Sequence, residues 1–146
     1  ITGARHEGFG TLALAKNEPD AVPMVSLDSL VADGLIDARL PAVIKLDVEG
    51  MEIEALTGAK WLMQRDCMII CEEHGSDRTH GITRYLINEM SLKVFVFDPT
   101  RCRFFRLDGI ERLDRIKKHR WVGYNVFATS SALWEERLLS ATWKYR

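Results

Sequence analysis

The segment Pro41–Glu54, PAVIKLDVEGMEIE, constrains the fold more than any other part of this chain. A short apolar run ends on two carboxylates, Asp47 and Glu49, and Gly50 precedes a segment with helical spacing. This pattern predicts a buried strand over 43–48 that is followed at once by a helix. Because residues two apart on a strand face the same side, Asp47 and Glu49 are expected to point together.

Two interpretations of these acids stay open. Ligands of open α/β sheets bind outside the carboxyl ends of the strands, so Asp47 and Glu49 are candidates for a functional site. The structural alternative is that Asp47 caps the following helix and Glu49 is solvated.

The surrounding pattern alternates between strands and helices. Apolar residues at helical spacing predict a helix over 52–64, between the strand 43–48 and a second apolar strand over 68–72. Two strands joined by a helix of this length predict a right-handed parallel crossover. The other predicted elements are a hairpin of strands over 11–15 and 22–27, a short helix over 29–33 capped by Asp28 and ended by Gly34, a helix around 82–90, strands over 92–97, 103–107 and 121–129, and a helix over 131–139. This alternation predicts one α/β domain over residues 1–146, with a mostly parallel sheet.

Composition excludes several classes of protein. The chain has 146 residues, of which 47% are hydrophobic and 28% charged, as in an ordinary globular domain. No apolar stretch approaches the ~20 residues of a membrane span. Cys67 and Cys71, four apart on the predicted strand, are expected to lie in the core as reduced thiols, which favours a cytoplasmic location. We predict no metal site from these cysteines.

Charge is unevenly distributed. Residues 1–100 carry 9 basic and 16 acidic side chains, whereas residues 101–146 carry 11 basic and 5 acidic ones. The densest basic run is Arg112–Arg120. Few aromatic residues lie within it and no nucleic-acid motif accompanies it, so we interpret it as a solvated loop rather than a nucleic-acid site.

Two neighbouring strands end in residues that can perform chemistry. Asp47 and Glu49 end one strand, and Glu72, Glu73 and His74 end the next. If the strands are adjacent, these groups converge and could accept a proton from a hydroxyl as a general base. A divalent-metal site that performs hydrolysis is the alternative.

One further histidine lies close to these groups. His80 follows His74 by six residues, a spacing that does not indicate a metal site, and it is predicted to be a surface or capping residue. The common phosphate-binding, dinucleotide, serine-hydrolase and zinc-protease motifs do not occur in the sequence.

Three runs give a specific resemblance. They are VSLDSLVADG, VIKLDVEGMEIEALTGAKWLM and IICEEHG. Together they resemble the core of the FkbM family of S-adenosylmethionine-dependent methyltransferases. The matching features are the pair Leu27-Asp28, the run Lys45–Gly50, Glu52, the run Leu56–Ala59, Glu72 with His74, and the late run Tyr124–Phe127.

This resemblance implies a class I methyltransferase (Rossmann-like) fold. The strands 43–48 and 68–72 would be its fourth and fifth, and the later strands its sixth and seventh. The family's glycine-rich first loop and the acid that holds the cofactor ribose are not found in this sequence. The chain is therefore expected to be the C-terminal part of the domain, lacking the N-terminal strands, with the rest of the cofactor site upstream of residue 1. The chain alone is expected to bind S-adenosylmethionine weakly, and its exposed sheet edge to favour a homodimer.

The implied activity is S-adenosylmethionine-dependent methylation of a hydroxyl on a glycan, a lipid or another natural product. Asp47 would lie nearest the methyl donor and contact the cofactor, Glu49 and Glu72 would orient the acceptor, and His74 or Asp47 would receive its proton. The rival hypothesis is a non-catalytic α/β binding or scaffold domain. The expected partner is a small-molecule or glycan acceptor, without nucleic acid or a membrane span.

Overall fold

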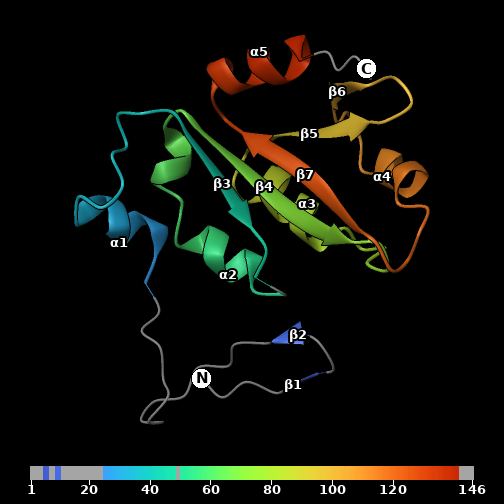
Figure 1. Cartoon of the computed structure of the whole chain (residues 1–146), viewed down its shortest axis with the longest axis horizontal. Helices are drawn as coiled ribbons and strands as arrows, with labels where there is room; N and C mark the ends of the chain where they lie inside the picture. The colour runs from blue at the N-terminus through green and yellow to red at the C-terminus, as the bar shows by residue number, and fades with distance from the viewer. Residues whose placement is uncertain (1–4, 7–8, 11–24, 49, 142–146) are drawn as a thin grey trace.

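The computed structural model in Figure 1 describes residues 5–6, 9–10, 25–48 and 50–141. The elements are β1 (Arg5–His6), β2 (Phe9–Gly10), α1 (Leu27–Ala32), β3 (Ala42–Leu46), α2 (Glu52–Thr57), the 3₁₀ helix η1 (Leu62–Gln64), β4 (Cys67–His74), α3 (Gly81–Asn88), β5 (Lys93–Asp98), β6 (Arg103–Arg106), α4 (Glu111–Ile116), β7 (Gly123–Thr129) and α5 (Ala132–Ser140). The short strands β1 and β2 pair with each other, and the other five form one sheet in the order β3-β4-β7-β5-β6.

The predicted parallel crossover is confirmed. β3 and β4 are parallel neighbours, in a register that runs from Ala42 opposite Cys67 to Leu46 opposite Cys71. Their carboxyl ends therefore lie side by side at one edge of the sheet, which is the arrangement that a shared site requires.

The prediction of a mostly parallel sheet is wrong, because the sheet is mixed. β7 lies antiparallel to both β4 and β5, and β6 lies antiparallel to β5. The reason lies in the connections. Only a short turn separates β5 from β6, and a short turn can join antiparallel strands but not parallel ones. β7 runs in the same direction as β6, with α4 between them along the chain, so three strands run one way and two the other.

The predicted helix over 52–64 is divided into α2 and η1. α2 ends at Gly58, and a Cβ atom at this position would lie 2.9 Å from the Cβ of Ser26. η1 begins separately because the Asp28 carboxylate accepts the backbone N–H groups of Trp61 and Leu62 at 3.0 and 2.9 Å. Glycine favours the end of a helix, and a carboxylate at the amino end favours a new start.

The same contacts correct the start of α1. Its cap is Ser26, whose hydroxyl accepts the N–H of Ser29 at 3.0 Å, so the prediction that Asp28 caps this helix is wrong. Asp28 instead caps η1 from a distance. The predicted hairpin lies largely outside the described residues, and the described end of its second strand, 25–27, leads directly into α1.

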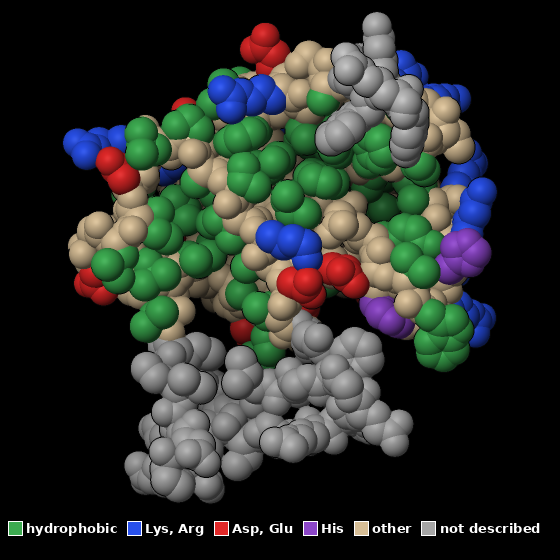
Figure 2. All heavy atoms as spheres, in the orientation of Figure 1, with side chains coloured by type: hydrophobic (Ala, Val, Ile, Leu, Met, Phe, Trp, Pro, Cys, Tyr) green, Lys and Arg blue, Asp and Glu red, His purple; other side chains and the backbone are tan. Residues whose placement is uncertain are grey.

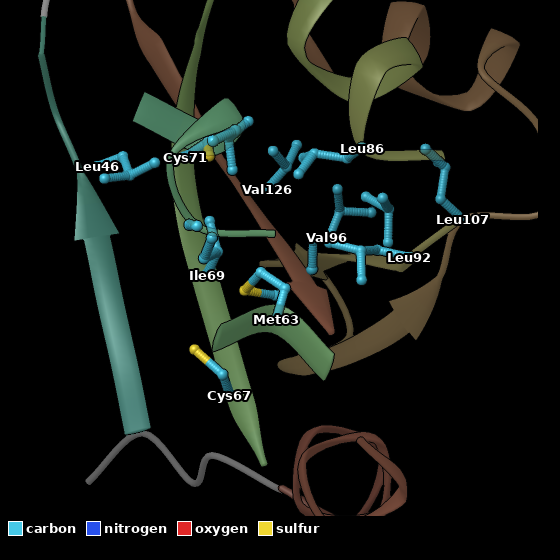
Figure 3. Close-up of a cluster of buried hydrophobic side chains, with 14 of the residues drawn as sticks. Leu46, Met63, Cys67, Ile69, Cys71, Leu86, Leu92, Val96, Leu107 and Val126 are labelled. Atoms are coloured by element: carbon cyan, nitrogen blue, oxygen red, sulfur yellow. The ribbon is translucent and has the colours of Figure 1, made fainter. Parts of the chain in front are cut away.

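Apolar side chains pack on both faces of the sheet. On one face, α2, η1, α3 and α4 cover the larger core, a cluster that includes Ile69 and Cys71 of β4 together with Met63 and Leu86 (Figure 3). On the other face, α5 places Leu138 against Met68 and Phe95. None of the described helices has the length and apolarity needed to cross a bilayer.

The two cysteines of β4 lie in the larger core as predicted. Cys67 and Cys71 are free thiols with no exposed surface. Burial raises the pKa of Cys67 to about 11 and that of Cys71 to about 12. Both are therefore protonated packing residues at neutral pH.

Candidate functional site

A cavity of about 380 Å³ lies at the carboxyl ends of β3 and β4. It is lined by Asp47, Gly50, Glu52, Glu72, His74, Asp77 and Ile82. The structure thus brings together three of the five strand-end residues that the sequence singles out. Glu73 does not line the cavity, and Glu49 lies outside the described residues. Figure 2 shows acidic side chains grouped beside a basic one near the lower border of the described surface.

Asp47 follows the last residue of β3 and is exposed. Lys45, two residues earlier and on the same side of the strand, donates a hydrogen bond to its carboxylate at 2.7 Å. This hydrogen bond raises the pKa of Lys45, and the negative charges of Asp47 and Glu72 raise it further. Lys45 therefore lies within electrostatic reach of acids from both strands.

Glu72 lies against the neighbouring strand β7. It is paired across the sheet with Asn125 of β7, and its side chain lies over Gly123. A Cβ atom at Gly123 would fall 1.6 Å from a carboxylate oxygen of Glu72. Glycine at position 123 therefore leaves the room that this carboxylate occupies.

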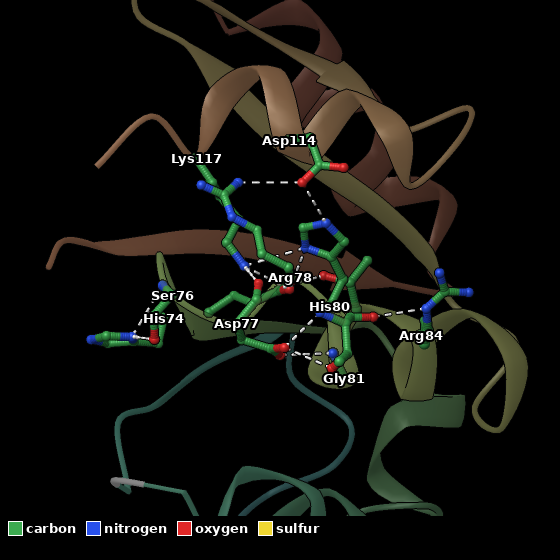
Figure 4. Close-up of polar contacts among 12 residues, drawn as sticks. His74, Ser76, Asp77, Arg78, His80, Gly81, Arg84, Asp114 and Lys117 are labelled. Carbon is green, nitrogen blue, oxygen red and sulfur yellow. Dashed lines mark hydrogen bonds and ion pairs between the residues drawn. The ribbon is translucent and has the colours of Figure 1, made fainter. Parts of the chain in front are cut away.

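His74 ends β4 with an exposed ring. Its Nδ1 accepts the backbone N–H of Ser76 at 3.2 Å and lies 2.6 Å from the Ser76 hydroxyl oxygen. Because Nδ1 accepts a hydrogen bond, the proton of the neutral ring is on Nε2. On the side of the ring away from the loop, His74 thus presents the Nε2–H group, which is a donor. Figure 4 shows that the His74 ring points away from His80.

Glu52 also lines the cavity, although the sequence singles it out only as one of the residues that match the family resemblance. Its side chain is buried and accepts the N–H of Gly50 at 3.0 Å. Gly50 has a φ of +95°, a backbone conformation that residues other than glycine rarely adopt. The spacing Gly-x-Glu therefore encodes a turn that places an acid at the cavity. That spacing is the signal by which Glu52 could have been found.

A buried polar cluster lies behind the cavity, formed by Glu73, Thr83, His80 and Lys117. Glu73 accepts hydrogen bonds from His80 Nδ1 at 2.9 Å and from Lys117 Nζ at 3.2 Å, and a further one from the Thr83 hydroxyl. All four side chains are buried. Glu73 points to the opposite side of β4 from Glu72, since side chains alternate along a strand.

Two sequence interpretations fail at this cluster. His80 takes the predicted N-cap position of α3, but its side chain makes no capping hydrogen bond and is buried. It approaches Asp114 at 3.3 Å (Figure 4), so His80 is neither a surface residue nor a side-chain cap. The basic run is not simply a solvated loop. Its first part belongs to α4, and Lys117 is fully buried against Glu73 and the carbonyl of Asp77.

The cluster fixes the loop that borders the cavity. Lys117 donates to the backbone of Asp77, and a Cβ atom at Gly75 would lie 2.0 Å from the His119 carbonyl oxygen. Burial by itself would raise the pKa of Asp77, but hydrogen bonds from Thr79 and from the backbone of Gly81 outweigh it and hold the pKa at about 2. Asp77 is therefore a fixed negative charge at the cavity wall.

The arrangement provides carboxylates that can accept protons or hydrogen bonds, beside one imidazole donor. Acids grouped in this way suit a cationic ligand and a second ligand that carries hydroxyl groups. Among the residues that the structure describes, no three or more histidines, cysteines, aspartates or glutamates are arranged to hold a metal ion.

Comparison with known proteins identifies the family. A family model described as the methyltransferase FkbM domain matches residues 4–95, a range that includes Asp47, Glu52, Glu72 and His74. No curated protein and no solved structure matches the chain. Because the family model covers more than half of the chain, this protein belongs to the FkbM methyltransferase domain family.

Proposed function

We propose that the protein that carries this chain transfers a methyl group from S-adenosylmethionine to a hydroxyl group. Membership of the family suggests methyltransferase activity. The observation that carries the finer proposal is the convergence of Asp47, Glu72 and His74 on one cavity at the carboxyl ends of β3 and β4. Groups that accept and donate hydrogen bonds are what a hydroxyl acceptor requires at such a site.

The cavity fits the charge of the cofactor. S-adenosylmethionine, when bound, supplies a methyl group on a cationic sulfur, and the transfer breaks that C–S bond, forms a C–O bond and releases the hydroxyl proton. Asp47, Glu52 and Asp77 give the cavity wall carboxylates that favour a cationic group. We propose Asp47 and Glu52 as the residues that contact it.

The chain's own residues then have separate roles. Asp47, exposed at the end of β3, receives the proton of the acceptor hydroxyl. His74 is less suited to this role, because its Nδ1 is occupied by Ser76 and its Nε2 carries a proton, so it orients the acceptor by donating a hydrogen bond. Glu72, positioned over Gly123, accepts a hydrogen bond from the acceptor. The resemblance gives Glu49 an orienting role as well.

We also propose a class I, Rossmann-like arrangement for the sheet. In this assignment β3 and β4 are the fourth and fifth strands, β5 and β7 are the sixth and seventh, and the chain forms the C-terminal part of the domain. The parallel pair β3–β4 with its helical crossover supports the assignment. Since the methyl group is already activated, alignment at the strand ends is the main contribution expected from the protein.

The test compares Asp47→Ala with Glu54→Ala in the full-length protein that carries this chain. The assay measures the formation of S-adenosylhomocysteine with a panel of hydroxylated acceptors, namely n-alkanols and methyl glycosides. Asp47→Ala is expected to lower kcat/KM by about 10²-fold or more, the usual contribution of a general base. Glu54 is exposed on α2 and serves as the control, with activity expected to stay within about twofold.

Two outcomes would contradict the proposal. Equal losses in the two variants would show that Asp47 is a structural residue. A full-length protein that binds neither S-adenosylmethionine nor S-adenosylhomocysteine in calorimetric titration would favour the rival hypothesis, a non-catalytic binding or scaffold domain.

A further inference from the structure

The sheet divides at the end nearest the site. β7 stays paired with β4 as far as Gly123, opposite His74. Its pairing with β5 covers only three residue pairs and ends at Phe95 opposite Phe127, after which β5 pairs with β6 alone. The strands therefore separate over 96–98 and 123–126, and Figure 1 shows them diverging beside α4.

A second cavity, of about 650 Å³, occupies this gap. This volume lies within the range of cavities that hold small molecules. Its wall is largely apolar and includes Val96, Phe97, Phe104, Leu113, Ile116 and Phe127.

The polar side chains of the wall are few. They belong to Tyr124 and Asn125, and the Tyr124 hydroxyl already accepts the backbone N–H of His119 at 2.9 Å. The Asn125 amide is the second polar group of the wall, and Asn125 is paired with Glu72 across the two strands. The cavity therefore offers many apolar contacts and one amide.

This cavity adjoins the candidate site. Gly123 and Asn125 belong to its wall, and the Glu72 carboxylate lies directly against Gly123. Glu72 in turn lines the smaller cavity with Asp47 and His74. A molecule whose hydroxyl lies beside Glu72 can thus extend its remaining part between β5 and β7.

We propose that the cavity between β5 and β7 binds the apolar body of the methyl acceptor, which is an aliphatic alcohol and not a glycan. The proposal rests on the methyl-transfer function proposed above. A sugar in this cavity would leave most of its hydroxyl groups without partners, which is unfavourable. An alkyl chain would instead exchange water for the apolar wall.

The experiment measures binding directly, by NMR titration of the full chain with hexanol, octanol, decanol and methyl glucoside. Each added methylene should tighten binding by about fourfold, the equivalent of about 0.8 kcal/mol. Decanol should shift the amide signals of Asn125, Phe127 and Phe97 but not those of Leu107–Ile110, which line a different cavity. Methyl glucoside should produce no such shifts.

A matched pair of variants adds a second readout. Ile116→Phe fills the cavity from α4, which removes room for about two methylenes and should weaken decanol binding by more than about tenfold. Ile87→Phe makes the same change on α3, beside the other cavity, and should leave binding unchanged.

The outcomes separate this proposal from the function on which it rests. Binding that is independent of chain length, preference for the glucoside, or equal effects of the two variants would overturn the cavity assignment. Decanol binding with the expected dependence, but without methylation by the full-length protein, would support the cavity and contradict the proposed function.

Discussion

At the scale of single residues, the two adjacent acids Glu72 and Glu73 have opposite surroundings. Glu72 lines the candidate site, whereas Glu73 is fully buried on the other side of β4 with His80 and Lys117. Burial removes the hydration of these charged groups, so each depends on its partner. Removing one partner therefore leaves an uncompensated charge in the interior.

This dependence gives a prediction for Lys117. The substitution Lys117→Met keeps most of the length of the side chain but removes the ammonium group that donates to Glu73 and to the Asp77 carbonyl. The free energy of unfolding is expected to fall by about 3–5 kcal/mol, measured by urea denaturation. Lys118→Met, at the exposed neighbouring position, should change it by less than about 0.5 kcal/mol. A loss below about 1 kcal/mol for Lys117→Met would show that the pair contributes little.

The convergence of Asp47, Glu72 and His74 was predictable from the sequence, and the buried cluster was not. Asp47 follows β3, and Glu72 and His74 lie at the end of its parallel neighbour β4, so their convergence is a consequence of pairing. The partners of Lys117 lie 37 to 44 residues away in the sequence, and no local pattern relates them. The sequence of the basic run does not show that the fold places Glu73 against Lys117, so the whole run is interpreted as solvated.

At the scale of elements, Gly58 sets how α1 and α2 meet. The backbone N–H of Asp28 donates to the Gly58 carbonyl at 2.9 Å. A Cβ atom at position 58 would lie only 2.9 Å from the Cβ of Ser26. Gly58→Ala should therefore push the two helices apart and lower the free energy of unfolding by about 1–3 kcal/mol. Thermal unfolding measures this change.

The matched control for Gly58→Ala is Gly81→Ala at the first position of α3. A Cβ atom there would meet its nearest neighbour, Asp77 Oδ2, at 3.6 Å, which is ordinary contact. Alanine is also the better helix former, so the melting temperature should stay constant or rise. A lower melting temperature for Gly81→Ala, or an unchanged one for Gly58→Ala, would contradict the account of these contacts.

The turn between β4 and α3 gives a prediction of pH dependence. Asp77 accepts hydrogen bonds from Thr79 and Gly81, and its pKa is lowered from 3.8 to about 2. A lowered pKa stabilises the fold above the unfolded value and loses this effect as the pH falls through the folded value. The stability lost in Asp77→Asn should therefore be constant above about pH 4 and disappear toward pH 2. Urea unfolding at a series of pH values measures it.

The control for this pH series is Asp33→Asn, at the exposed end of α1. This substitution also removes one carboxylate but leaves the hydrogen bonds of the turn in place, so it is the reference for the loss of one carboxylate between pH 4 and pH 2. If the stability of Asp77→Asn follows the same course as that of Asp33→Asn, the hydrogen bonds of the turn do not stabilise the charged carboxylate.

Most element types were predictable from hydrophobic spacing, but α4 was interpreted as part of a loop, and strand directions were predictable only in part. The crossover between β3 and β4 contains a helix, and this implies parallel strands. The direction of β7 depends on where it enters the sheet, between β4 and β5, which no local pattern encodes. The end of α2 at Gly58 depends on Ser26, more than thirty residues earlier in the chain. Spacing alone therefore predicted one continuous helix.

At the scale of the whole molecule, the sheet separates two cores of unequal size. Among the residues that the structure describes, the larger core contains sixteen buried residues and the smaller contains three, Met68, Phe95 and Leu138. α5 covers the smaller core, and polar contacts also join it to the rest of the sheet. Ser131 donates to the Asp66 carboxylate at 2.6 Å and the Trp134 indole donates to the Asp66 carbonyl at 3.0 Å. A helix held by so small a core should open without unfolding the whole sheet.

Hydrogen exchange of the full chain tests this difference. Leu138→Ala removes the α5 side chain that is buried in the smaller core, so amides of α5 should exchange faster while the slowest amides of β4 keep their rates. Ile69→Ala, in the larger core, should lower the global free energy of unfolding by about 2–5 kcal/mol and accelerate exchange in β4, β7 and α3 together. Uniform acceleration by Leu138→Ala would mean that α5 unfolds only with the sheet. Acceleration confined to α5 would mean that the candidate site, at the far end of β4, keeps its geometry when this helix opens.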